Sequence, residues 1–203
     1  MALPVATYKT IKERTDQVLF KDRKSKFYGF AFPIEEENEV KPLLESLKNA
    51  FPSAGHFCYA WQLGIDNLRY RANDDGEPKN SAGMPIYGQI QKFELTNILV
   101  VVIRIYGGTK LGVSGLINAY RTTSRMAIEA ASIESRVVEI KMQLDFGYPL
   151  MSKVMHVLKI WNANIIVQEL KEKCTMIIAI PRNKADLVYK EFEKIYSLTI
   201  TKL

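Results

Sequence analysis

The chain has 203 residues, a mass of 23.2 kDa and a formal net charge of +6, with 47% hydrophobic and 25% charged residues. This composition excludes a mainly disordered, collagen-like or coiled-coil chain, and the length suits one large domain or two small ones. The modest basic excess permits an anionic partner without establishing one.

Cysteine content and hydropathy predict the compartment. Cys58 and Cys174 are the two cysteines, so we expect neither a disulfide scaffold nor a Cys-x-x-Cys metal site. The segment from Met1 to Phe20 has no apolar run, which argues against a signal peptide. The apolar stretch Leu95–Ile103 is shorter than the roughly 20 residues of a membrane-spanning helix. We therefore expect a cytoplasmic protein without a membrane partner.

The first part of the chain predicts strands around a helix. Residues 17–21 and 25–33 have the pattern of two strands, and apolar residues at helical spacing follow from Val40 to Phe51. Alternating residues then predict a hairpin in which Leu63 pairs with Leu68. That register places Arg69 and Arg71 on the polar face of the hairpin, with His56 and Cys58.

A loop, a helix and a buried strand are expected next. Residues 74–82 are rich in turn formers, 84–93 suggest a short helix, and 95–105 are apolar on both faces, as in a central strand. A glycine-rich turn then precedes a helix for which Ser114 is the expected N-cap. Arg121 and Arg125, four residues apart, share one face of that helix.

From about Val137 the pattern starts again as strand, helix, strand, strand, helix, strand. This order is typical of a split βαβ, ferredoxin-like domain. We therefore predict an α+β protein with domains at 1–136 and 137–203, with Trp61 in the first core and Trp161 in the second.

The turn after the central strand is the first candidate site. Arg104 precedes Gly107, Gly108, Thr109, Lys110 and Gly112, so a strand, a glycine turn and a helix follow one another. Backbone N–H groups at such a helix start can bind an anion, and Lys110 would add charge. The alternative is a purely structural turn, because glycine also permits tight backbone angles.

Two further groups have structural alternatives that we favour. Asp74, Asp75 and Glu77 could hold a hard cation, but they equally suit a turn in which Asn80 or Ser81 caps the next helix. His56 and Cys58 could act as base and nucleophile, yet no oxyanion motif accompanies them. We assign no catalytic residue, no metal and no cofactor.

Several separated motifs resemble the YigZ/IMPACT family. They are Lys24-Ser-Lys-Phe27, His56-x-Cys58, Asp74-Asp-Gly-Glu-Pro-Lys-Asn-Ser-Ala-Gly-Met-Pro85 and the segment from Leu95 to Gly112. The resemblance implies a first domain similar to the tip domain of elongation factor G, a βαβ-type ribosomal-protein-like fold. It also implies a second domain similar to the last domain of that factor. No enzymatic activity is established for the family, and its eukaryotic relatives regulate translation by competing for a large activator protein.

The resulting hypothesis is a protein that binds RNA or the ribosome. The predicted contacts are Arg104, Gly107, Gly108, Thr109, Lys110, Gly112 and Ser114, flanked by Arg121, Arg125, Arg69 and Arg71. The alternatives are a protein-interaction module and an enzyme for a small phosphorylated or nucleotide substrate, with His56, Asp74, Asp75 and Glu77 as a second site. The sequence leaves the oligomeric state open.

Removal of divalent cations should leave folding unchanged. The acidic loop reads as a turn, and no cysteine or histidine cluster supports a structural zinc ion. Thermal melts with and without EDTA should therefore coincide, and a large drop in melting temperature on chelation would contradict this.

Overall fold

The computed structural model describes residues 6–203, which divide into two compact units. One unit is Tyr8–Arg136, and the other is Val137–Leu203 together with the described residues up to Thr7. Residues 1–5 lie outside the described range. The predicted first domain begins with them, and so does the segment in which we expect no signal peptide. Among the described residues, no helix has the length and apolar character needed to cross a bilayer.

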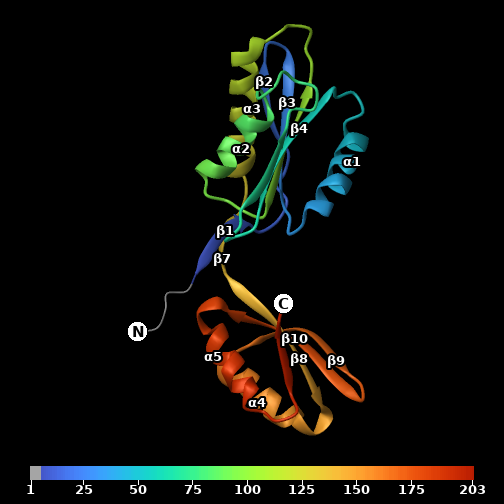
Figure 1. The fold of residues 1–203 in the computed structure, drawn as a ribbon. Helices are drawn as coiled ribbons and strands as arrows, with labels where there is room; N and C mark the ends of the chain where they lie inside the picture. The colour runs from blue at the N-terminus through green and yellow to red at the C-terminus, as the bar shows by residue number, and fades with distance from the viewer. Residues whose placement is uncertain (1–5) are drawn as a thin grey trace. The chain divides into compact units, whose positions relative to one another are not determined.

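The first unit is a five-stranded antiparallel sheet covered by helices on both faces (Figure 1). The strand order is β2-β3-β6-β4-β5. The strands are β2 (Val18–Asp22), β3 (Ser25–Pro33), β4 (His56–Leu63), β5 (Arg69–Asn73) and β6 (Ile98–Ile105). Helix α1 (Val40–Ala50) covers one face, and α2 (Gly83–Lys92) and α3 (Gly112–Glu129) cover the other.

Strand β6 is the centre of this unit. Every side chain from Ile98 to Ile103 is fully buried. Ile98, Val100 and Val102 belong to the core under α2 and α3. Leu99, Val101 and Ile103 belong to the core under α1. The prediction of a strand that is apolar on both faces is confirmed, although the strand begins at Ile98 and not at Leu95.

The predicted register of the β4–β5 hairpin is wrong by one residue. Leu63 pairs with Arg69 and Trp61 with Arg71, so these two arginines lie on the α1 face of the sheet. Tyr70 lies on the opposite face, where its ring stacks on Tyr87 with centroids 4.1 Å apart. A one-residue slip exchanges the two faces of a strand, so Arg69 and Arg71 do not share a face with His56.

A second, two-stranded sheet pairs β1 (Thr7–Ile11) with β7 (Ile133–Val137). The sequence pattern did not predict either strand. Each has only five residues, and apart from Thr10 and Ile11 their side chains are exposed or only partly buried. In neither segment do apolar and polar residues alternate regularly along the sequence, which is the pattern on which a strand prediction depends.

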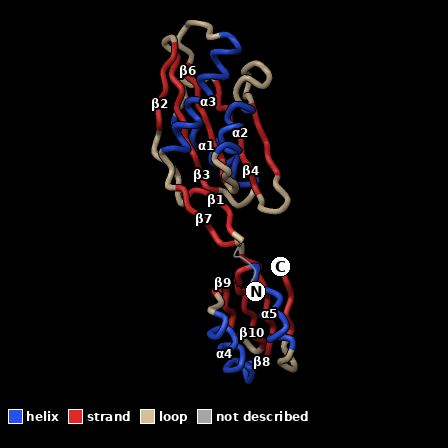
Figure 2. Tube along the Cα trace, turned by 90° about the vertical axis from the view of Figure 1, so that its left-hand side faces the viewer, coloured by secondary structure: helices blue, strands red, loops and turns tan. Residues whose placement is uncertain are grey.

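The second unit has the predicted element order around a four-stranded sheet, β11-β8-β10-β9. Its strands are β8 (Glu139–Gly147), β9 (Asn164–Leu170), β10 (Lys173–Pro181) and β11 (Thr199–Lys202). Helices α4 (Met151–Trp161) and α5 (Arg182–Glu193) lie on one side of the sheet, as Figures 1 and 2 show. Trp161 packs on this core, whereas Trp61 is buried in the first unit.

Shortening Leu99 should destabilise the first unit alone. Leu99 is fully buried and belongs to a core that contains no residue after Arg136 among those described. Leu99→Ala should cost about 2–5 kcal/mol through lost burial and a residual cavity. Native-state hydrogen exchange should show this loss in β3 and β6, while amides of β8 and β10 keep their wild-type protection.

Leu170→Ala is the matched control, because Leu170 is 50% exposed. It should change stability by less than about 0.5 kcal/mol. An equal loss of protection in both units of Leu99→Ala would contradict the separate cores.

Candidate functional site

The glycine turn after β6 is shaped by a close backbone approach. The Gly107 N–H donates to Ser25 Oγ at 3.1 Å. A Cβ at Gly107 would lie 2.0 Å from the carbonyl carbon of Lys24, so no larger residue fits there without moving the backbone. Gly108 and Gly112 have φ of +86° and +74°, a region that strongly favours glycine. Glycine is thus required by both packing and conformation.

Helix α3 begins directly from this turn, but Ser114 is not its N-cap. The N-cap is Leu111, which makes no side-chain capping hydrogen bond, and Ser114 lies inside the first turn with its side chain exposed. The first backbone N–H groups of a helix lack intrahelical partners and carry the positive end of its dipole. The start of α3 therefore remains available to an anion.

The β2–β3 hairpin adds a basic segment that the site prediction missed. Residues 21–26 carry four cations and one carboxylate, and the Arg23 guanidinium donates to the Lys110 carbonyl oxygen at 3.5 Å. Lys24 lies against Gly107. The Lys24-Ser-Lys-Phe27 motif was the signal in the sequence, but the hairpin is about 80 residues away from the turn along the chain.

The first two carboxylates of the acidic loop hold neighbouring backbone segments in place through hydrogen bonds. Asp74 Oδ1 accepts hydrogen bonds from the backbone N–H groups of Ala82 and Gly83 at 2.9 and 2.8 Å, where α2 begins. Asp75 Oδ2 accepts from the N–H of Phe57 at 2.6 Å. The expected cap by Asn80 or Ser81 is therefore wrong, because Asp74 performs it from outside the helix. Among residues 6–203, no group of acidic, histidine or cysteine side chains is arranged to hold a metal ion.

Glu77, the third acid of the loop, forms a buried ion pair with Arg104. Arg104 Nη1 lies 2.7 Å from Glu77 Oε1, and the two side chains are 7% and 4% exposed. The Tyr120 hydroxyl donates to the same oxygen at 2.8 Å. Arg104 Nε is buried and has no hydrogen-bond partner within the described part of the chain. Arg104 is therefore held in place with spare capacity to donate.

His56 and Cys58 do not form a reactive pair. His56 Nδ1 lies 2.8 Å from the carbonyl oxygen of Asp75, which can only accept, so the proton of a neutral ring is on Nδ1. The Cys58 thiol contacts the Asp74 carbonyl and the Tyr120 hydroxyl. Burial raises the pKa of both Cys58 and Tyr120, so both groups keep their protons near neutral pH.

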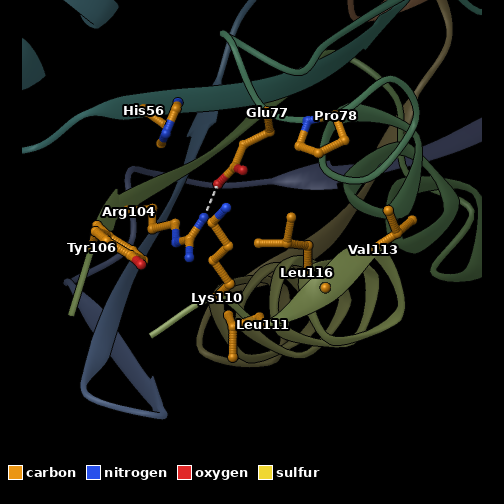
Figure 3. Close-up of a pocket in the computed structure, with 10 residues that line it drawn as sticks. His56, Glu77, Pro78, Arg104, Tyr106, Lys110, Leu111, Val113 and Leu116 are labelled. Carbon is orange, nitrogen blue, oxygen red and sulfur yellow. Dashed lines mark hydrogen bonds and ion pairs between the residues drawn. The ribbon is translucent and has the colours of Figure 1, made fainter. Parts of the chain in front are cut away.

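The turn, the loop and β4 meet around one pocket of about 510 Å³ (Figure 3). Its polar residues are His56, Glu77, Arg104 and Lys110, and the start of α3 at Gly112 lines it as well. Figure 3 shows the Arg104 side chain reaching Glu77 across the pocket. Tyr106, Pro78, Leu111, Val113 and Leu116 complete the walls.

The remaining predicted residues lie outside this pocket. Thr109 is exposed on the turn, and Arg121 and Arg125 are exposed on α3, where Arg125 lies 3.7 Å from Glu129. Arg71 pairs with Glu37 at 3.5 Å on the α1 face, and Arg69 shares that face. Gly107, Gly108, Ser114, Asp74 and Asp75 are likewise not among its lining residues. The structure thus brings together Arg104, Lys110, Gly112, His56 and Glu77, but not the two hairpin arginines.

Comparison with known proteins gives consistent matches. Residues 23–128 match the Impact N-terminal domain. The chain is 27% identical over 164 residues to the IMPACT family member YigZ of Escherichia coli, covering 80% of each protein. It is 31% identical to an IMPACT family member of Thermus thermophilus, covering 68% of this chain and 73% of that one. A crystal structure described as that of a hypothetical protein covers 99% of this chain and 98% of its own, with a TM-score of 0.74 and 24% identity, which shows a shared fold.

Breaking the Arg104–Glu77 pair should be costly. Arg104→Met leaves the Glu77 carboxylate buried without its cation, which should lower the free energy of unfolding by about 3–5 kcal/mol. Lys110→Met removes an exposed cation from the same turn and should change stability by less than about 0.5 kcal/mol. Urea unfolding of both variants measures the difference, and equal midpoints would contradict the role of the pair.

Proposed function

The chain belongs to the IMPACT family, and from that premise we propose that it binds RNA, free or within the ribosome, in translation or its regulation. The observation that carries the proposal is the convergence of Lys110, the glycine turn and the start of α3 on one pocket. The family resemblance supports the process, because eukaryotic relatives regulate translation.

The charge balance of the pocket favours an anionic ligand. The charge of Glu77 is compensated by Arg104 at 2.7 Å. The Lys110 ammonium is exposed, and no carboxylate among residues 6–203 is paired with it. A lysine beside the unpaired N–H groups of a helix start is a common arrangement for phosphate.

The basic surface continues beyond the pocket, which favours a polymer over a small anion. The β2–β3 hairpin brings Arg23 and Lys24 to the glycine turn, and α3 carries Arg121 and Arg125 on its exposed side. Successive phosphates of one strand can contact such a surface without any reading of sequence.

We also infer that the two units correspond to domains 1–136 and 137–203, except that the described residues up to Thr7 group with the second unit. For the second, the strand order β11-β8-β10-β9 with two helices on one side supports a ferredoxin-like fold. For the first, likeness to the tip domain of elongation factor G rests on the family resemblance.

The pocket itself favours one alternative, an enzyme for a small phosphorylated or nucleotide substrate. His56 lines it, and with the proton on Nδ1 its Nε2 is an acceptor. The hydrogen bonds of Asp74 and Asp75 argue against an enzyme, because both carboxylates already accept from backbone N–H groups.

Lys110→Ala should weaken binding to RNA about equally for all sequences. One fewer phosphate contact also lowers the salt dependence of log K by roughly one unit. Titration of fluorescein-labelled RNAs and of purified ribosomes at two salt concentrations measures both effects.

The matched control is Lys92→Ala, which removes an exposed lysine of the same unit that does not line the pocket. It should retain wild-type affinity and salt slope. The proposal fails if the wild type binds no RNA more tightly than about 10⁻⁴ M, or if the two variants behave alike.

A further inference from the structure

An aromatic ring stands at the mouth of the pocket, next to its cations. Tyr106 is 50% exposed, and the Arg104 guanidinium carbon lies 5.3 Å from its ring centroid. We propose that the pocket holds one nucleoside monophosphate unit, with its base stacked on Tyr106 and its phosphate at Lys110 and the start of α3. This inference rests on the proposed function, since it takes the glycine turn as the phosphate site.

The phosphate end has two independent supports. The first is the exposed Lys110 ammonium beside an 18-residue helix that starts without a side-chain cap. The second is Arg104, which is 6% exposed, lines the pocket and has an Nε–H without a partner among the described residues. A buried donor of this kind is costly unless a ligand or water satisfies it.

The proposal of a base is supported by the apolar side chains that line the pocket. Pro78, Val113 and Leu116 give the pocket an apolar side, as Figure 3 shows. A base offers an apolar, polarisable face that stacks on an aromatic ring regardless of its identity. The Arg104 guanidinium lies over one face of the Tyr106 ring, so a base would stack on the other face.

The size of the pocket is compatible with one such unit. Its volume of about 510 Å³ lies within the usual range of small-ligand sites, roughly 300–1,000 Å³. A base within a duplex is stacked on its neighbours and would have to leave the helix to enter. The proposal therefore predicts preference for single-stranded over duplex RNA.

Titrations of the full chain with chemically matched probes test the proposal. The small probes are adenosine 5′-monophosphate, adenosine and inorganic phosphate. The polymers are one RNA sequence with a 5′-phosphate, with a 5′-hydroxyl, and as a blunt duplex. Adenosine monophosphate should bind more tightly than either of its parts, and both single strands more tightly than the duplex. A large advantage of the 5′-phosphate would assign the unit to an RNA end, and equal binding to an internal nucleotide.

Tyr106→Ala should weaken adenosine monophosphate and single-stranded RNA by about tenfold or more, the range of one lost base–aromatic stack. Tyr106→Phe keeps the ring and should bind within about threefold of wild type, as a control for folding and for the phenol. Lys110→Ala should instead weaken every phosphate-bearing probe, because it acts on the other end of the ligand.

The possible failures are distinct. If RNA binds in a Lys110-dependent manner while Tyr106→Ala and strandedness have no effect, the nucleotide pocket is refuted and RNA binding stands. If adenosine monophosphate binds in a Tyr106-dependent manner but RNA does not bind, RNA binding is refuted and the pocket is a small-nucleotide site.

Discussion

The first unit depends on strand β6 being buried on both faces. Because helices cover both sides from Ile98 to Ile103, the strand cannot shift register without exposing apolar side chains. Its pairing with β3 and β4 is thereby fixed, and Phe27 and His56 both lie opposite Arg104. The pocket forms where this strand ends, so its residues are positioned by the core and not by the loop alone.

The buried Arg104–Glu77 pair lies where this core borders the pocket. Taking two charges out of water is expensive, and a buried pair is only weak evidence of stability. Here the pair has a clear geometric consequence, because Glu77 belongs to the loop whose neighbours Asp74 and Asp75 hold α2 and β4. One ion pair therefore couples the loop to β6, and Tyr120 adds α3 through its hydrogen bond to Glu77. The pocket walls come from elements that this network keeps together.

The sequence predicted the elements better than their pairing. Helices and strands with a strong period were located within a few residues, because one or both of their faces are buried. The β4–β5 register was missed because Leu63 pairs with Arg69 and not with Leu68, so the loop is one residue longer than expected. The first three residues of β5 are all exposed, so their burial does not distinguish the two faces of that strand. Within the site, the local order of strand, glycine turn and helix was visible. The contacts of Arg104 with Glu77 and of Lys24 with Gly107 were not, because each joins residues far apart in the chain.

Arg104 and Lys110 have different surroundings, and we therefore expect them to act differently on a ligand. Arg104 is buried and paired, so its guanidinium is positioned before any ligand arrives, and its planar fork loses little freedom on binding. Lys110 is exposed on a turn with glycine at positive φ on both sides, so its ammonium is accessible to a ligand. A buried, paired guanidinium and an exposed ammonium in one pocket suit a ligand that is first attracted by charge and then oriented by contact. The turn needs glycine at Gly107 because the backbone of Lys24 comes too close for any Cβ, and this contact holds the β2–β3 hairpin against the turn that carries Lys110.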